Sequence, residues 1–195
     1  DNGLILPPRV APIQIVIVPV AQHKEGVLDA AYEIRDTLKA AGVRVKMDAS
    51  EQSPGWKFSE YEMKGVPLRI EIGPRDIENN SCVLVSRVSR AKTFVSLDGI
   101  EESVEAGLKS VHDELYNRAL ENLKNRTSNA VTYDELLEIA STKSGFIRAM
   151  WCGDLECELK LKEVADVTSR CLPFEGEPVG NTCVCCGKPT DKLVL

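Results

Sequence analysis

Cysteines supply the clearest chemistry in this sequence. Most of the seven lie beyond residue 150, where Cys152 and Cys157 form one pair and the segment "CVCC" holds Cys183, Cys185 and Cys186. Two local pairs of thiolates satisfy the tetrahedral coordination that zinc prefers, and the CxxC spacing of Cys183 and Cys186 suits the second pair, although Cys185 lies within reach. Because the segment has more thiols than one ion needs, we expect a structural zinc rather than a catalytic zinc with an open coordination position.

Other uses of these thiols fit the pattern less well. One alternative is a set of unrelated reduced thiols. Another is a redox CxxC, but such a motif normally opens a helix after a strand, whereas Cys183 and Cys186 precede "GKPTDK". An odd number of cysteines, clustered in this way, argues against a disulfide framework and for a reducing compartment. We expect Cys82, in a predicted strand, and Cys171 to be small buried hydrophobic residues.

Charged and aromatic side chains in residues 53–97 suggest a second kind of chemistry. The whole chain carries a net charge of −6 with a pI near 5.1, which argues against binding nucleic acid through bulk positive charge. Residues 53–97 nevertheless contain seven basic and five acidic residues, a local net charge of +2. Trp56, Phe58 and Tyr61 lie among them, so this region suits unpaired RNA bases that stack on rings and meet mixed charges. The alternative is that these are ordinary solvated strand faces.

Signatures of small-molecule enzymes are missing from the sequence. It contains no GxxxxGK[ST] phosphate loop and no GxGxxG after the first predicted strand. His23 and His112 lie in different predicted elements, so a small α/β enzyme built on His23 and a thiol is not favoured. No apolar stretch approaches the roughly 20 residues of a membrane-spanning helix, and the opening residues lack the features of a secretory signal. The sequence therefore predicts a cytoplasmic protein that does not enter membranes.

Hydrophobic patterning predicts an α/β domain in the first part of the chain. "IQIVIVPV" (13–20) is typical of a strand buried on both faces, and "VRVKMD" (43–48) of a second strand. Apolar residues at helical spacing lie between them, which predicts a βαβ unit with parallel strands. The other expected elements are a short helix at "WKFSEYEMKG", strands at 67–73, "CVLVSRV" and "KTFVSL", and a long helix with the stripe Ile100, Val104, Leu108, Val111, Leu115 and Leu123. Together they predict a three-layer α/β fold around a mixed five-stranded sheet.

A smaller α+β domain is predicted to follow. The polar stretch "KNRTSNAV" (124–131) is interpreted as a linker, after which Thr132 and Glu135 have capping-box spacing. A helix at "YDELLEIASTK", a strand at "GFIRAMW", a charged helix through "ECELKLKEVAD" and a region of turns complete this domain. We place the first domain at residues 1–125, with its core at about 11–124, and the second at 126–195.

Three stretches of the sequence together resemble a known family. "LPPRVAPIQIVIVPV", "PGWKFSEYEMKGVPLRIEIGPRD" and "WCGDLEC…TSRCLPFEGE…CVCCGKP" look like the C-terminal part of a prolyl-tRNA synthetase of the archaeal and eukaryotic type, which some bacteria also carry. The resemblance covers essentially the whole chain. It implies an anticodon-binding domain of the kind shared with the class II histidyl, threonyl and glycyl enzymes, followed by a zinc-binding domain peculiar to this prolyl type.

The resemblance also implies roles for individual residues. Glu62, Arg69 and Asp76 would lie on the face that meets the anticodon, where the two guanines shared by all proline anticodons are read. Carboxylates accept the N1 and N2 hydrogens of guanine while arginine donates to O6 and N7, so mixed charges suit this task. Arg75 and Lys92 would contact phosphates or neighbouring groups. The zinc ligands of the family match Cys152, Cys157, Cys183 and Cys186.

For the parent enzyme, the resemblance implies ATP-dependent ligation of proline to tRNA(Pro), with ATP and Mg²⁺ in a catalytic domain. It also implies a homodimer whose subunits contact each other mainly through that domain. The chain begins just after the last catalytic motif of the family, with a short tail from that domain, and stops a few residues before the family's C-terminal tyrosine. We therefore expect a fragment, monomeric by itself, that binds tRNA and does not aminoacylate. The alternative is a metal-stabilised protein-interaction module that does not bind RNA.

Overall fold

The chain divides into two compact units, which are described one at a time. The structure is a computed structural model that describes residues 3–195. The first unit runs to Asn117, and the second comprises Arg118–Leu195. The division falls inside a long helix, α4 (Ile100–Asn125), before the boundary that we predicted at residue 125.

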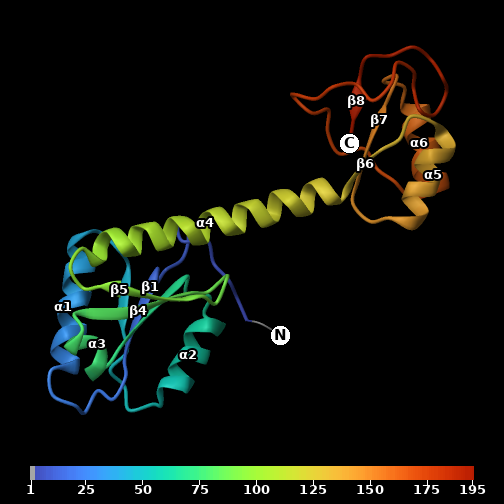
Figure 1. The fold of residues 1–195 in the computed structure, drawn as a ribbon. Helices are drawn as coiled ribbons and strands as arrows, with labels where there is room; N and C mark the ends of the chain where they lie inside the picture. Colours follow the sequence, from blue (N-terminus) through green and yellow to red (C-terminus); the bar gives the residue numbers. More distant parts are fainter. Residues whose placement is uncertain (1–2) are drawn as a thin grey trace. The chain divides into compact units, whose positions relative to one another are not determined.

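The first unit is built on a five-stranded sheet, as the sequence predicted (Figure 1). The strands occur in the spatial order β2-β1-β3-β4-β5. The central strands β1 and β3 pair in parallel, as do β1 and β2, whereas β4 and β5 join as antiparallel strands. Their bounds are β1 Ile15–Pro19, β2 Val45–Met47, β3 Leu68–Ile72, β4 Ser81–Ser86 and β5 Lys92–Ser96. The sheet is therefore mixed, and it begins with the predicted βαβ unit.

Helices cover both faces of this sheet and make three layers. Helix α1 (Val27–Ala40) and α4 bury their apolar residues in one cluster with Ile15 and Ile17 of β1. Helix α2 (Pro54–Met63) packs on the opposite face, where Tyr61 joins Val16 and Val18. Strand β1 is buried on both faces, as the sequence predicted, because successive side chains of a strand point to opposite faces and helices cover each. Of the strands, β1 is the one against which α2 packs most closely.

Helix α4 follows the predicted apolar stripe only in its first half. Ile100, Val104 and Val111 are buried, whereas Leu123 is exposed because it lies beyond the part of the helix that packs on the sheet. Within residues 3–195, no helix, α4 included, combines the length and the apolar character that a membrane span requires.

One short helix was not among the elements that we predicted. Helix α3 (Pro74–Glu78) forms directly after β3. Proline at its first position has its backbone angle already set for a helix, and the Asp76 carboxylate accepts a hydrogen bond from the Gly73 N–H at 2.8 Å. These two local features stabilise one helical turn that periodicity alone does not reveal.

The second unit is a small three-stranded sheet with two helices. The strands have the order β6-β7-β8, with bounds Thr127–Asn129, Phe146–Met150 and Leu193–Val194. Helices α5 (Tyr133–Thr142) and α6 (Leu155–Ala165) pack with β7 around a core that includes Leu136, Ala149 and Val184. The interpretation of residues 124–131 as a linker was wrong. They contain the end of α4 and β6, because their backbone pairs in parallel with β7.

The segment after α6 contains turns, as predicted, but Cys171 within it is exposed rather than buried. Its carbonyl accepts a hydrogen bond from the Leu195 N–H at 3.0 Å, so the backbone is held while the thiol stays in solvent. Cys82 is fully buried in the first unit, as predicted, and burial raises the pKa of its thiol to about 12. It is an inert core residue.

The contribution of the capping box at the start of α5 to the stability of the second unit can be tested. The Thr132 hydroxyl accepts from the Glu135 N–H at 3.3 Å, and the Glu135 carboxylate accepts from the Thr132 N–H at 3.2 Å. We predict that Thr132→Ala lowers the unfolding free energy of the second unit by about 1 kcal/mol. Denaturant unfolding followed by Trp151 fluorescence in a Trp56→Phe background would measure it. Thr142→Ala, at the other end of α5, is the control, and an equal loss there would contradict the capping role.

Candidate metal centre and nucleic-acid interface

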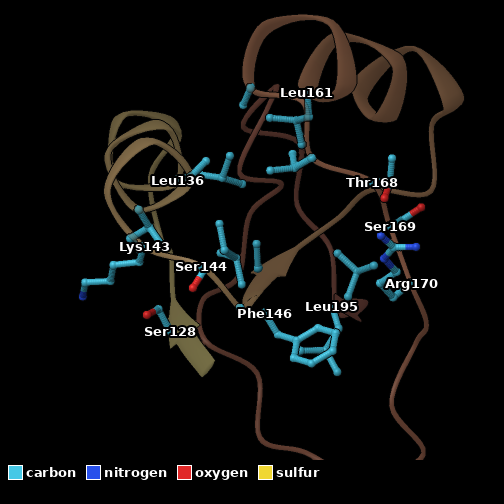
Figure 2. Close-up of a pocket in the computed structure, with 18 of the residues that line it drawn as sticks. Ser128, Leu136, Lys143, Ser144, Phe146, Leu161, Thr168, Ser169, Arg170 and Leu195 are labelled. Carbon is cyan, nitrogen blue, oxygen red and sulfur yellow. The ribbon is translucent and has the colours of Figure 1, made fainter. Parts of the chain in front are cut away.

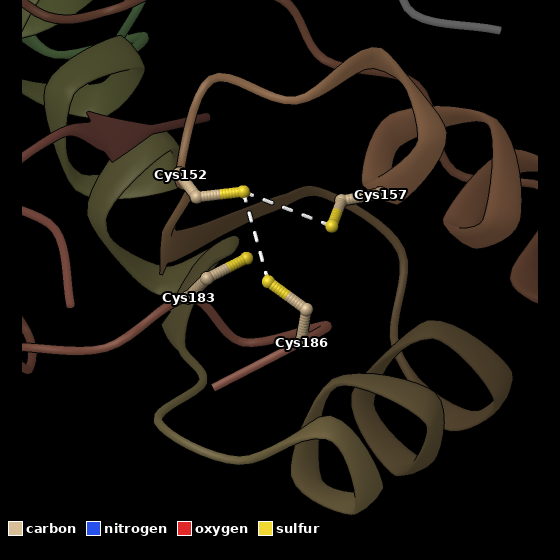
Figure 3. Close-up of side chains that lie close together, drawn as sticks. All are labelled: Cys152, Cys157, Cys183 and Cys186. Carbon is tan, nitrogen blue, oxygen red and sulfur yellow. Dashed lines mark hydrogen bonds between the residues drawn. The ribbon is translucent and has the colours of Figure 1, made fainter. Parts of the chain in front are cut away.

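Four cysteine sulfurs converge in the second unit (Figure 3). The sulfur atoms of Cys152, Cys157, Cys183 and Cys186 all lie within 4.8 Å of one another, and Cys152 is 3.7 Å from both Cys157 and Cys186. A tetrahedral zinc with Zn–S bonds of about 2.3 Å places its sulfurs about 3.8 Å apart. A disulfide would bring two of them to about 2.05 Å. The group could therefore hold one metal ion, and its spacing fits tetrahedral coordination.

Local structure explains how the two halves of this cluster form. Cys152 lies just after β7, and Cys157 lies in the first turns of α6, whose N-terminus is capped by the Asp154 side chain. On the other side, a tight turn closes where the Gly187 N–H donates to the Cys183 carbonyl at 2.9 Å. Cys185 lies outside the group of four, so the structure brings together the cysteines that match the family's ligands.

The protonation of the thiols follows from their surroundings. Burial by itself raises the pKa of Cys183, but backbone N–H groups, including those of Cys185 and Cys186, outweigh it and lower the pKa to about 7. Burial and the neighbouring thiols raise the pKa of Cys157. These sulfurs suit a borderline-soft cation, which binds the deprotonated form of each thiol.

In the first unit, cross-strand pairing places charged side chains in rows on the α2 face of the sheet. One row runs Val16, Arg69, Val85, Lys92 across β1, β3, β4 and β5, and the next runs Val18, Glu71, Val83, Phe94. Paired residues share a face and lie about 5 Å apart. On β1, which α2 covers, both rows have valines. On β3 they have the charged residues Arg69 and Glu71.

Arg69 is the hub of an ion-pair network on this face. Its guanidinium donates to the Glu71 carboxylate at 2.9 and 3.0 Å and to the Glu62 carboxylate at 3.2 Å. Lys92 donates to the other Glu71 oxygen at 3.0 Å. The Arg69 and Glu71 side chains are largely buried, whereas Glu62 and Lys92 keep 41% and 56% of their side-chain surface exposed. The inner pair is fixed, and the outer two groups are accessible.

An aromatic ring lies beneath the hub. The guanidinium carbon of Arg69 lies 3.9 Å from the centroid of the Phe58 ring, a cation–π arrangement that holds the plane of the guanidinium. Arg69 therefore covers one face of the Phe58 ring, and Tyr61 is buried. Of the three aromatic residues that the sequence suggested for base stacking, only Trp56 is exposed.

A small pocket opens beside this network. It has a volume of about 200 Å³, below the roughly 300–1,000 Å³ of pockets for drug-sized ligands, so it suits a single ring system. Its lining residues are Val16, Tyr61, Glu62, Val66, Arg69, Val85, Ser86, Arg87, Arg90 and Lys92. Three of the five predicted interface residues, Glu62, Arg69 and Lys92, thus meet at one pocket.

The structure does not bring the other two predicted residues into this pocket. Asp76 and Arg75 lie on α3, beyond the carboxyl end of β3, and the Asp76 carboxylate caps that helix. Gly73 is four residues along from Arg69, and a strand rises about 3.3 Å per residue, which separates the two places by about 13 Å. They can meet one RNA chain only at different nucleotides.

Phe94 is a surface residue that our reading of the sequence missed. It lies on β5 on the same face as Lys92, and 74% of its surface is exposed. The signal was present in "KTFVS", because strand alternation places Lys92 and Phe94 on one face. An exposed ring beside a cation can stack on an RNA base.

A larger hollow lies in the second unit and has a different lining (Figure 2). It has a volume of about 1160 Å³ and is walled by aliphatic and aromatic side chains such as Leu136, Phe146, Leu161 and Leu195. Figure 2 shows the Lys143 side chain extending away from the other labelled residues. The lining also includes the charged residues Arg126, Lys143, Glu158, Asp166 and Arg170, so the hollow is mixed in character.

Comparison with known proteins identifies both units. Residues 14–107 match the family model described as "Anticodon binding domain", so the first unit is an anticodon-binding domain. Residues 133–195 match the family model "Prolyl-tRNA synthetase, C-terminal". The chain belongs to the prolyl-tRNA synthetase family, as the sequence resemblance predicted.

Similar proteins carry the corresponding name. A proline–tRNA ligase of Clostridium novyi (strain NT) is 56% identical over 194 residues, and one of Clostridium botulinum (strain 657 / Type Ba4) is 57% identical over the same length. A proline–tRNA ligase 2 of Bacillus cereus (strain ZK / E33L) is 52% identical. Each match covers 100% of this chain but 40% of the relative, so the chain spans about two fifths of the length of these proteins.

The cysteine cluster predicts a unit-specific loss of stability. Because the free energy of metal binding at a structural site is folding free energy, Cys152→Ser should abolish zinc binding and lower the unfolding free energy of the second unit by more than about 2 kcal/mol. Elemental analysis and Trp151 fluorescence would measure both effects. Cys171→Ser and Cys185→Ser are matched controls that should keep one zinc per chain. Unchanged stability of the Cys152 variant, or zinc loss in the Cys185 variant, would contradict the assignment.

Proposed function

We propose that this chain binds the anticodon of tRNA(Pro) as part of a prolyl-tRNA synthetase. The observation that carries the proposal is the network of Glu62, Arg69, Glu71 and Lys92 around an open pocket, in a domain of the anticodon-binding family. The relatives' name supports ligation of proline to tRNA(Pro) by the longer protein, with ATP and Mg²⁺ acting in its catalytic domain. This chain would supply binding and positioning, as a monomer by itself and within a homodimer in the parent enzyme.

Guanine is the base whose hydrogen-bonding groups match this network. Its N1 and N2 hydrogens require an acceptor, which the accessible Glu62 carboxylate provides. Its O6 requires a donor. The Arg69 Nη1, which bonds Glu62 in this structure, can donate to that oxygen instead, while Nε and Nη2 stay bonded to Glu71. Lys92 lies near enough to supply a second donor or to neutralise a phosphate. The base would replace one ion-pair contact and leave the fixed inner pair intact.

The residues outside the pocket would serve neighbouring nucleotides. Arg75 and Asp76, on α3 beyond the carboxyl end of β3, would meet the second guanine or the phosphate beside it. Phe94 would stack on a base that has left the anticodon stack, since every base offers a π-face. This division explains why a domain with a weak local positive charge can hold RNA, because specific contacts replace bulk attraction.

The second unit would be held together by zinc on Cys152, Cys157, Cys183 and Cys186. The sulfur spacing supports this proposal, and so does the small core of the unit. Ligand thiols must stay reduced, which agrees with the cytoplasm as the expected location.

The rival function is a metal-stabilised module that binds protein instead of RNA. Membership of the anticodon-binding family supports RNA. Salt separates the two, because RNA binding weakens steeply with rising salt as counterions are released, whereas a protein interface of mixed charge does not require such a slope.

Substitution of Glu62 tests the reading of guanine. Glu62→Gln keeps the shape but replaces one acceptor oxygen by a donor that opposes the guanine N–H groups. We expect the affinity for tRNA(Pro) to fall by about 1–3 kcal/mol, with little change for a tRNA(Pro) whose anticodon guanines are replaced by adenines. Fluorescence anisotropy at one fixed salt concentration would give both dissociation constants.

Glu60→Gln is the matched control, since Glu60 lies on the same helix and pairs with Lys64 away from the pocket. It should leave the ratio of the two affinities unchanged. If wild-type protein bound both tRNAs equally, or Glu62→Gln weakened both to the same extent, Glu62 would not read guanine.

Substitution of Phe94 tests the stacking role. Because the ring is mostly exposed, Phe94→Ala should leave the stability nearly unchanged. It should weaken the binding of both tRNAs by about 1–3 kcal/mol, since stacking tolerates any base. Phe174→Ala, an exposed ring in the second unit, is the control for general loss of aromatic surface. Equal binding by the Phe94 variant and wild type would rule out stacking at this position.

A further inference from the structure

A buried lysine on α2 has no part in the interface described above. Lys57 is 1% exposed, although lysine is almost never fully buried without a partner. Its Nζ donates to the Asp48 carbonyl at 3.0 Å and to the Gln22 side-chain oxygen at 3.4 Å, and it lies 3.9 Å from the Asp48 carboxylate. These partners offset the cost of removing the ammonium from water.

Asp48 is in turn fixed to the sheet. It directly follows β2, and its N–H donates to the Ile17 carbonyl of β1 at 3.0 Å. Its carboxylate accepts from the Ser50 N–H at 2.9 Å and interacts with Tyr61, whose pKa is raised to about 12 by burial and by this carboxylate. The Lys57 and Tyr61 side chains, one turn apart, therefore attach α2 to a rigid point beside the central strand.

The rotation of α2 about its axis decides where its other side chains point. Each residue of an α-helix turns the side-chain direction by about 100°, so Phe58 and Glu62 follow Lys57 and Tyr61 at a fixed angle. Both members of the second pair contact Arg69. A helix held by its first pair thus presents its second pair to the guanine-reading network.

Apolar packing also contributes to that rotation, but it is limited. Lys57 and Tyr61 are the buried residues of α2, and the apolar cluster beneath the helix holds four buried side chains, including Tyr61 itself, with Phe58 packed against them. A helix of ten residues is marginal in water without tertiary contacts. The polar link to Asp48 is a directional contact, which an apolar contact of the same area would not be.

We infer that Lys57 is a positioning residue for anticodon reading, which acts through Glu62 by fixing the rotation of α2 against Asp48. The inference rests on the proposed function. It assigns to Lys57 no contact with RNA, because the side chain is enclosed by the protein.

The test is Lys57→Met, which keeps the length and apolar stem of the side chain but removes its hydrogen bonds. The readout is the discrimination ratio, defined as the dissociation constant for tRNA(Pro) with both anticodon guanines replaced by adenines divided by that for tRNA(Pro). We expect the ratio to fall about tenfold, while the affinity for the substituted tRNA changes less than about twofold. Lys46→Met, an exposed lysine on β2, removes the same charge and should preserve the ratio.

A double substitution separates positioning from a general structural effect. If Lys57 acts through Glu62, the Lys57→Met/Glu62→Gln protein should lose no more discrimination than Glu62→Gln alone, because the two residues share one route. Additive losses, or a Lys57→Met protein that keeps the wild-type ratio, would overturn the inference. If Lys57→Met does not fold, Asp48→Asn provides a milder variant, because it retains the backbone carbonyl that accepts from Lys57. We expect it to lower the discrimination ratio about threefold.

Amide hydrogen exchange distinguishes failure of this inference from failure of the proposed function. Amides of α2 should exchange faster in Lys57→Met than in wild type, with those of β1 and β3 unchanged, whether or not the chain binds RNA. Equal binding of the two tRNAs by wild-type protein would refute anticodon reading and leave this measurement to decide the role of Lys57 in the helix. Unchanged exchange in α2 would refute that role.

Discussion

The buried ion pair of Arg69 and Glu71 is the interaction on which the α2 face of the first unit, the face that we propose reads the anticodon, depends. A guanidinium and a carboxylate that are both mostly removed from water must hold each other, because each alone would carry an uncompensated charge. The pair lies on a central strand, so its geometry is fixed by sheet hydrogen bonds on both sides. Phe58, Glu62 and Lys92 arrange around it. The chain itself therefore organises this surface, and in our proposal RNA exchanges only the outermost contact.

The two units obtain their stability from different sources. The first buries a continuous apolar cluster between the sheet, α1 and α4, which leaves its opposite face available for charged groups. The second has a short sheet, a smaller core and a large cavity. In our proposal a metal ion bound by the four cysteines compensates for this small core, because it links the end of β7 and the start of α6 to a turn about 30 residues later.

Features with a local or periodic signature could be predicted from the sequence. The buried run of β1, the helical spacing of α1 and the capping box of α5 each depend on neighbouring residues, and each was confirmed. Features that depend on distant contacts were missed or misjudged. β6 forms only because its backbone meets β7, Cys171 is exposed because its backbone pairs with the last residue, and Tyr61 is buried because α2 packs on β1.

By itself, the sequence determined which chemical groups the protein has and the order in which strands and helices present them. It identified the cysteines and the mixed charges of residues 53–97, since residue type and spacing are local properties. Only the tertiary structure decided that Lys92 reaches Glu71, that Asp76 caps a helix away from the pocket, and that Lys57 is buried. The physical reason is that strand register and helix rotation are set by contacts between segments far apart in the chain, and a shift of one residue in either would point these side chains elsewhere.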